Sequence, residues 1–136
     1  MPCTVDLVPV DPSLVAGVWP HARHLVKRAM DRTKLGNFAD IEREVLGGLQ
    51  MLWLAWNGTA IEAAAVTRLV DINHERICII VACGGNNRAR WLPLIAGIEQ
   101  FARDEGCAAV RIIGRKGWQR ILSEYRADYV VMDRKL

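Results

Sequence analysis

Long apolar runs are absent from this sequence of 136 residues. No stretch approaches the ~20 consecutive apolar residues that a membrane-spanning helix needs, so we expect no membrane span. The first residues also lack the basic region followed by an apolar region that marks a secretion signal. Together these absences predict a cytoplasmic protein.

Patterns typical of disulfides and metal sites are also lacking. The four cysteines form no Cys-x-x-Cys pair and lie mostly in apolar segments, which predicts buried free thiols in a reducing compartment: Cys3, Cys78, Cys83 and Cys107. Cys83 has no histidine placed by sequence to activate it as a nucleophile. His21 and His24 are three residues apart without a third ligand, so we expect no metal.

The length and the charge set further bounds. A chain of 136 residues predicts one domain, residues 1–136, with a core of its own. The net charge of +3 permits an anionic ligand. Basic residues are not concentrated as they are in nucleic-acid binders, so a nucleic-acid partner is not expected.

The strongest pattern lies between His74 and Gly106. Residues 76–83 form a nearly unbroken apolar run, which is typical of a strand covered on both faces. A polar loop over 84–88 follows, and then apolar residues recur at helical spacing: Leu94, Ile95, Ile98, Phe101 and Ala102. Residues 107–113 read as another buried strand. Strand, helix and strand with short links predict a right-handed crossover with parallel strands.

The rest of the chain supplies the other elements. We expect a strand over 4–10, a helix begun by Asp11 and Pro12, and a kink or a division into two pieces at Pro20. Asp40 is expected to cap a second helix. Strands over 50–56 and 59–70 flank Asn57-Gly58, a strong hairpin signal, and a turn over 71–74 leads to the central strand. A short helix over 118–122 and a final strand, Tyr129 to Met132, complete the pattern.

This order of elements resembles the GNAT superfamily of N-acyltransferases across essentially the whole chain. The segment 91–107 looks like the family's helix after the pyrophosphate-binding loop, with Ala102 late in the helix and Gly106 at its end. The resemblance implies an α/β (α+β) fold with a mixed, mostly antiparallel central sheet, splayed central strands and flanking helices.

The resemblance also implies a co-substrate, acetyl-CoA, whose acetyl group passes directly to an amine that the sequence does not identify. Acetyl-CoA would lie between the splayed strands Ile77–Cys83 and Ala108–Ile113. The residues implied in binding it are the backbone at Ile80, Val81 and Ala82 and the loop formed by Gly84, Gly85, Asn86, Asn87, Arg88, Ala89 and Arg90.

The family's loop signature, Arg/Gln-x-x-Gly-x-Gly/Ala, is altered here. It falls on residues 86–91, where Ala89 and Trp91 occupy the glycine positions, and Trp91 is expected to crowd a phosphate. A shift of the loop would bring Gly84 and Gly85 into use instead. Arg88 and Arg90 flank this loop as candidate anion ligands, and a second basic group follows the crossover: Arg111, Arg115, Lys116 and Arg120.

Candidate catalytic residues follow from the needs of acyl transfer. The leaving thiolate needs a proton, and Tyr125 lies near the family's tyrosine position. A carboxylate can assist the amine, but the central strand contains none, and Glu75 at its start is the nearest. Glu62 and Asp71 on the neighbouring strand are further candidates. For each carboxylate, a solvated charge at a sheet edge is the simpler interpretation.

A function of another class stays open at this point. A catalytically silent GNAT-like domain that binds a protein partner fits the altered loop, the lack of a carboxylate within the central strand, and five tryptophans in a short chain. Such a chain is similar to accessory proteins encoded by bacteriophages, including virion-associated ones. The sequence leaves open whether the chain forms a homodimer.

Overall fold

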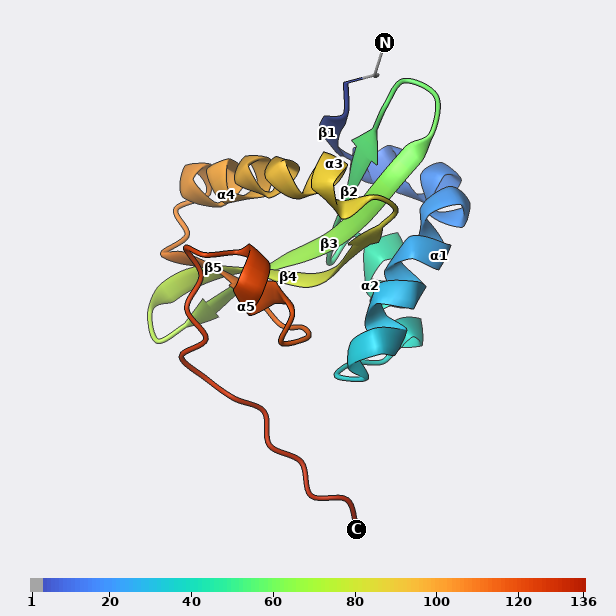
Figure 1. The fold of residues 1–136 in the computed structure, drawn as a ribbon. Helices are drawn as coiled ribbons and strands as arrows, with labels where there is room; N and C mark the ends of the chain where they lie inside the picture. The colour runs from blue at the N-terminus through green and yellow to red at the C-terminus, as the bar shows by residue number, and fades with distance from the viewer. Residues whose placement is uncertain (1–3) are drawn as a thin grey trace.

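The computed structural model describes residues 4–136, which form one five-stranded sheet with helices on both faces (Figure 1). The strands lie side by side in chain order: β1 Asp6–Pro9, β2 Met51–Trp56, β3 Ile61–Ile72, β4 Glu75–Gly85 and β5 Ala109–Ile112. The pairs from β1 to β4 are antiparallel, and β4 pairs with β5 in parallel. The predicted mixed, mostly antiparallel sheet is confirmed. The thiol of Cys3 lies outside the described residues.

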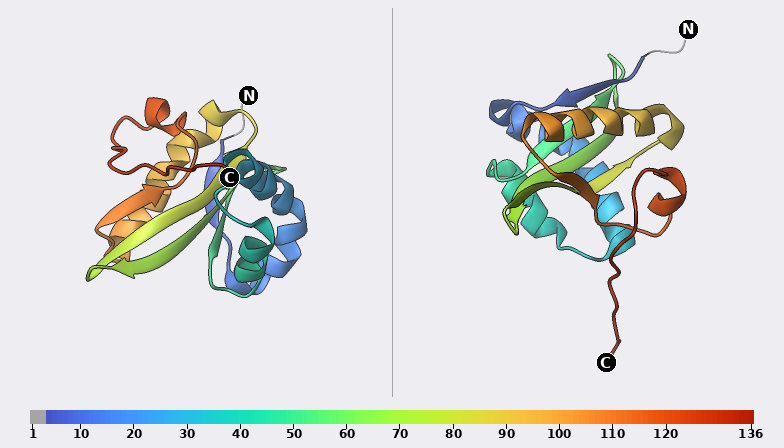
Figure 2. Two further views of the ribbon diagram at one scale, coloured as in Figure 1. Left: turned by 90° about the horizontal axis from the view of Figure 1, so that it is seen from below. Right: turned by 90° about the vertical axis from the view of Figure 1, so that its left-hand side faces the viewer.

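The helices cover the sheet from two sides. A short 3-10 turn, η1 (Pro12–Leu14), leads into α1 (Val15–Thr33), which lies with α2 (Phe38–Leu46) on one face. The other face carries α3 (Arg88–Trp91), η2 (Leu92–Leu94) and α4 (Ile95–Asp104), and α5 (Trp118–Ile121) follows β5. Figure 2 shows the two layers of helices with the twisted sheet between them.

Two cores form because side chains alternate along the strands. On β2, Leu52 and Leu54 point to the α1 side, while Trp53 between them points to α4. Leu25 of α1 and Ile98 of α4 are almost fully buried, at 1% and 2% exposure, and mark the centres of the two cores. The sheet is therefore covered on both faces, as the unbroken apolar run of β4 predicts.

The helix starts partly confirm the predictions. The Asp11 side chain accepts a hydrogen bond from the Ser13 N–H at 2.8 Å and caps the first turn as expected. Asn37, and not Asp40, caps α2, because the Asn37 side chain accepts from the Asp40 N–H. The two-piece alternative at Pro20 is wrong, since α1 runs through that residue as one helix.

Two tight turns set the register of the antiparallel strands. The Asn57 side chain accepts from the N–H groups of Thr59 and Ala60, both at 2.8 Å, which closes the predicted hairpin. Asn73 and His74 both have positive φ angles, 51° and 67°, and join β3 to β4 through a two-residue turn.

Two predicted elements after β4 differ from the structure. The long helix is divided, because Pro93 lies in the 3-10 turn η2 between α3 and α4. The final strand from Tyr129 to Met132 does not form, and residues 126–136 have no helix or strand assignment. The chain instead leaves the body of the protein as an extended segment (Figure 1).

Candidate functional site

A bulge in β4 separates the two parallel strands. On β3, Val66 pairs with Ala82 but Thr67 pairs with Ile80, so Val81 is an extra residue without a partner on β3. The side chains of Val81 and Ala82 both join the α1-side core, as expected for a bulge. Pairing between β4 and β5 also ends here, at Ile80 and Ile112. A bulge bends its strand, which explains why β4 and β5 part from this point.

A cleft opens where the strands part. It lies between the carboxyl ends of β4 and β5 and the last turns of α1. Its lining residues come from α1 (Arg28, Ala29, Arg32, Thr33), β4 (residues 80–85), the end of β5 and its following turn (residues 112–115), and α5 (Trp118). The implied site at Ile80, Val81, Ala82, Gly84 and Gly85 is thus part of one cleft.

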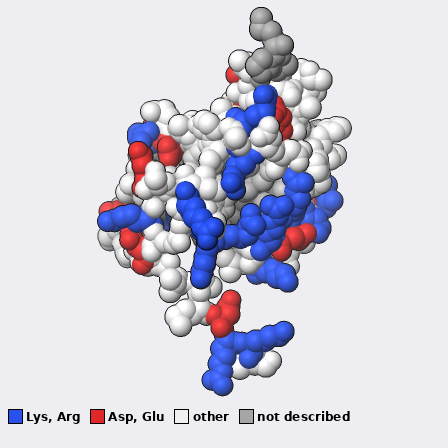
Figure 3. All heavy atoms as spheres, in the orientation of Figure 1, with Lys and Arg blue, Asp and Glu red and all other residues white. Residues whose placement is uncertain are grey.

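The cleft is strongly basic. Arg28 and Arg32 reach it from α1, and Arg115 reaches it from the turn after β5, while no carboxylate lines it among the described residues. Figure 3 shows Lys and Arg side chains gathered on the face that carries α1 and the segment from β5 to α5. An arginine donates several hydrogen bonds in a fixed plane and suits phosphate oxygens. The cleft is therefore suited to an anion.

Gly84 and Gly85 belong to β4 and not to the loop. They pair with Ala64 and Ala63 on β3. A Cβ on Gly84 would lie 3.0 Å from both the Ala29 Cβ and the Leu25 carbonyl oxygen of α1. A Cβ on Gly85 would overlap the Glu62 carbonyl oxygen. The prediction that these glycines lie in the loop is wrong, because both positions are needed for close packing against α1 and β3.

The loop proper is short and is tied to β3 and α1. Asn86 donates its backbone N–H to the Glu62 carbonyl at 2.9 Å and accepts from the Arg28 guanidinium at 3.2 Å. Asn87 takes the left-handed conformation, φ 52°, that starts α3. Arg88 and Ala89 are exposed. The loop thus lies close to one of the arginines of the cleft.

Arg90 forms a two-pronged ion pair with Glu62 of β3. Its Nε lies 2.6 Å and its Nη2 2.9 Å from the two carboxylate oxygens. This arginine holds the pKa of the Glu62 carboxyl below its ordinary value of 4.5. The structure therefore gives Glu62 and Arg90 a common role, which is to fix the start of α3 on β3.

We expect the Glu62→Gln variant to melt at a lower temperature than wild type at neutral pH, because the ion pair is lost. The pKa of Glu62 is depressed in the folded state, so its contribution to stability is present above pH 4.5 and is lost as the pH falls further. Melting curves measured at neutral pH and at several pH values below 4.5 should show that the difference in melting temperature between variant and wild type becomes smaller as the pH falls. Glu75→Gln, an exposed glutamate, is the control, and a difference that does not change with pH would contradict this role.

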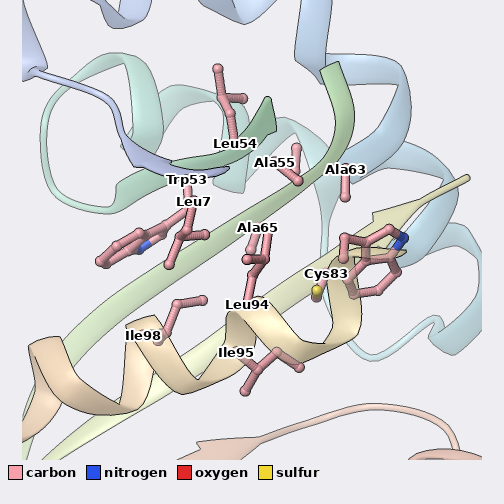
Figure 4. Close-up of a pocket in the computed structure, with 12 residues that line it drawn as sticks. Leu7, Trp53, Leu54, Ala55, Ala63, Ala65, Cys83, Leu94, Ile95 and Ile98 are labelled. Atoms are coloured by element: carbon pink, nitrogen blue, oxygen red, sulfur yellow. The ribbon is translucent and has the colours of Figure 1, made fainter. Parts of the chain in front are cut away.

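Trp91 and Cys83 lie on the face of the sheet that α4 covers. Trp91 is buried at 5% exposure, packs with Ala55 and Ala63, and meets Trp118 edge-on at 6.4 Å. The expectation that Trp91 crowds a phosphate is wrong, because its ring enters the core. Figure 4 shows Cys83 in the apolar hollow between the sheet and α4. Burial raises the pKa of the Cys83 thiol to about 12, so it is not a thiolate nucleophile.

The two predicted catalytic residues do not line the cleft. Glu75 is exposed at the far end of β4, five residues before Ile80, which corresponds to roughly 17 Å along a strand. Tyr125 is half-buried, and its hydroxyl donates to Glu99 of α4 at 2.7 Å. Burial, together with this carboxylate, raises the pKa of Tyr125. The structure therefore does not bring either residue together with the candidate binding loop.

The contact between Tyr125 and Glu99 leads to a second prediction. Tyr125→Phe should lower the free energy of unfolding by about 0.5–1.5 kcal/mol, the usual net value of such a hydrogen bond. Binding of an anion in the cleft should not change. Denaturant unfolding and calorimetry measure the two effects. A variant with normal stability and a large loss of turnover would instead support a role as general acid.

The two arginines of α1 were not among the residues expected at the site. Arg28 and Arg32 lie four residues apart on the exposed side of that helix, a spacing that places both on one face. This pattern is visible in the sequence but is also typical of a solvated helix face. Arg111 was expected near the cleft; its guanidinium instead lies over the ring of Tyr129, 5.9 Å from the centroid.

Among residues 4–136, no group of three or more His, Cys, Asp or Glu side chains could hold a metal ion. Within the same range, no helix has both the length and the apolar character needed to cross a membrane.

Comparison with solved structures finds this fold in known proteins. An aminoglycoside acetyltransferase from an uncultured soil metagenomic sample, crystallised with sisomicin, has a TM-score of 0.69 at 10% identity and covers 97% of this chain and 96% of its own. A GNAT family acetyltransferase of Staphylococcus aureus has a TM-score of 0.64 at 12% identity, with 98% and 99% covered. A ribosomal-protein-alanine N-acetyltransferase of Brucella melitensis biovar Abortus has a TM-score of 0.67 at 10% identity, with 98% and 99% covered.

Comparison by sequence, in contrast, finds no match: no protein-family model and no curated protein matches the chain. At identities of 10–12% the likeness to solved structures concerns the fold. It extends over nearly the whole chain. The chain therefore has the fold of the GNAT-family acetyltransferases.

Proposed function

We propose that this protein is an N-acyltransferase that moves an acetyl group from acetyl-CoA to an amine. The observation that carries the proposal is the basic cleft at the point where β4 and β5 part. Acetyl-CoA combines a narrow, mostly uncharged arm with several phosphates. In this proposal the arm lies between the parted strands, and Arg28, Arg32 and Arg115 bind the phosphates.

The bulge supplies a donor for the reaction. Val81 has no partner on β3, and β5 no longer pairs with β4 at this position. The backbone N–H of Val81 is therefore the candidate donor to the thioester oxygen as negative charge develops on it. The thioester of acetyl-CoA is the substrate group here, and the backbone is the part of the protein that polarises it.

The bonds of the reaction balance without a further reactant. The amine nitrogen bonds to the carbonyl carbon, the carbon–sulfur bond breaks, and the sulfur takes the electron pair. The proton that the amine loses is equivalent to the proton that the thiolate gains. No carboxylate among the described residues lines the cleft. We infer that a water molecule carries this proton, and the amine reacts in its neutral form.

Calorimetric titration with acetyl-CoA tests the proposal directly. We expect one site per chain, and ATP, which carries phosphates without the pantetheine arm, should bind more weakly. Release of free CoA thiol on addition of amines of different classes, such as polyamines, amino acids and peptides, then tests transfer. If millimolar acetyl-CoA gives neither a heat of binding nor released CoA thiol, the chain is not an acyltransferase. The hypothesis of a protein-binding role is then favoured. Equal affinity for ATP would show recognition of phosphates alone.

A further inference from the structure

Asn86 links the loop after β4 to helix α1. Its side-chain oxygen accepts a hydrogen bond from Nη2 of Arg28 at 3.2 Å, across 58 positions of the sequence. Arg28 lines the basic cleft, whereas Asn86 itself does not. A loop residue that was expected to bind the co-substrate therefore contacts one of the arginines that would bind the phosphates.

The backbone of Asn86 is held on both sides. The end of β4, immediately before it, is paired with β3, and the Asn86 N–H donates to the Glu62 carbonyl at 2.9 Å. On the other side, Arg90 near the start of α3 forms an ion pair with the Glu62 carboxylate. The Asn86 side chain is therefore attached to a fixed backbone and can hold Arg28 in one place.

The three arginines of the cleft differ in this respect. Arg28 has Asn86 as its hydrogen-bond partner, while the side chains of Arg32 and Arg115 form no hydrogen bond or ion pair with any residue of 4–136. All three are exposed. A free, exposed arginine samples many rotamers, and a ligand that immobilises it pays for that loss of freedom. Arg28 is already held at the cleft before a ligand arrives.

The group that holds Arg28 carries no charge. Elsewhere the fold holds arginines with carboxylates, as in Arg23 with Glu42 at 2.8 Å and Arg43 with Asp40 at 3.0 Å. A carboxylate would neutralise the guanidinium and compete with a phosphate for its N–H groups. An amide oxygen occupies one donor and leaves the positive charge and the other donors for a ligand.

We propose that Asn86 is a positioning residue, which holds Arg28 in place to bind a phosphate of acetyl-CoA and does not contact the ligand itself. The inference rests on the proposed function, because acetyl-CoA is the ligand named there. It gives Asn86 a role other than the direct binding that the family resemblance implies. Both side chains are exposed, so loss of their hydrogen bond leaves no buried group unpaired and should not destabilise the fold.

A double-mutant cycle, measured by calorimetric titration with acetyl-CoA, tests this role. Asn86→Ala keeps the backbone N–H bonded to Glu62 and should weaken binding roughly 2–10-fold, the cost of immobilising one long side chain. In a protein that already carries Arg28→Ala, the same change should have no effect, because the side chain that Asn86 positions is gone. A second loss of similar size would overturn the proposal, since Asn86 would then contact the ligand. Unchanged affinity of the single variant Asn86→Ala would overturn it too.

Asn86→Asp tests whether the neutral amide matters. Aspartate has the size of asparagine and can hold Arg28 equally well, but its charge competes with the phosphate. We expect this variant to bind acetyl-CoA about 10-fold or more below wild type at low salt, and more weakly than Asn86→Ala. Affinity equal to that of wild type would contradict the proposed role of a neutral acceptor.

Side-chain mobility tests the inference without a ligand. NMR relaxation of the side-chain nitrogens in wild type should show Nε of Arg28 as more ordered than Nε of Arg32, and Asn86→Ala should remove the difference. If Arg28 is as mobile as Arg32 in wild type, Asn86 does not hold it, and the inference fails while the proposed function stands. If Arg28 is ordered but wild type neither binds acetyl-CoA nor releases its thiol, the proposed function fails, and the role of Asn86 fails with it.

Discussion

Replacing Arg28 and Arg32 together by alanine should weaken acetyl-CoA binding by about 100-fold or more. Both side chains line the cleft from α1, where no carboxylate among the described residues competes for them. A hydrogen bond to a charged group contributes about 1.5–3 kcal/mol, and about 1.4 kcal/mol corresponds to a factor of ten in affinity. Calorimetry at low salt, with the melting temperature measured in parallel, gives the result.

Lys27→Ala is the control for this experiment. Lys27 lies on the same helix, pairs with Asp31 at 2.9 Å, and does not line the cleft. Its loss should change affinity little, because exposed ion pairs contribute little. If Lys27→Ala weakens binding as much as the double variant, the affinity for acetyl-CoA depends on the net positive charge of the α1 surface and not on Arg28 and Arg32 in particular. If the double variant binds normally while Arg115→Ala does not, the phosphates lie on the β5 side of the cleft.

Gly85→Ala should destabilise the fold by about 1–3 kcal/mol, the usual cost of forcing one carbon into a tightly packed site. The added Cβ would overlap the Glu62 carbonyl oxygen and lie 2.5 Å from the Ala63 Cβ. These atoms belong to the backbone of β3 or are attached to it directly, so they can move only if the two strands part. Chemical denaturation measures the loss.

Gly17→Ala is the matched substitution for the stability test. Nothing lies within 4 Å of a Cβ at this position, which is in α1. Alanine is favoured over glycine inside a helix by roughly 0.5–1 kcal/mol, so this variant should gain stability. If Gly85→Ala is as stable as wild type, β3 and β4 approach each other less closely at this end, and the glycine has another role.

Much of the fold could be predicted because its signals are local. The unbroken apolar run of β4, the helical spacing in α4 and the turn at Asn57-Gly58 each determine an element within a few residues. Their order then limits the topology, since a strand, helix and strand with short links must form a right-handed crossover. The position of the candidate cleft between the two parallel strands was implied by the resemblance to the GNAT superfamily.

The chemistry of the cleft depended on contacts between distant segments. The sequence placed Gly84 and Gly85 in a phosphate loop, but the close approach of α1 and β3 makes them strand residues. Arg28 and Arg32 precede β4 by some fifty positions in the sequence and meet it only in space. The predicted roles of Tyr125 and Glu75 are weakened in the same way, since one bonds to Glu99 and the other lies at the far end of β4.

The sequence by itself determined most of the strands and helices up to β5, and that β4 and β5 run parallel. Those properties depend on spacing and on neighbours within one or two turns of the chain. Only the tertiary structure decided where β4 bulges, which arginines enter the cleft, and whether the segment after Tyr125 pairs with its own sheet. A bulge is a mismatch of one residue between two strands, and a cleft is bounded by several elements at once. Neither can be read from one segment alone, because each depends on how separate segments pack.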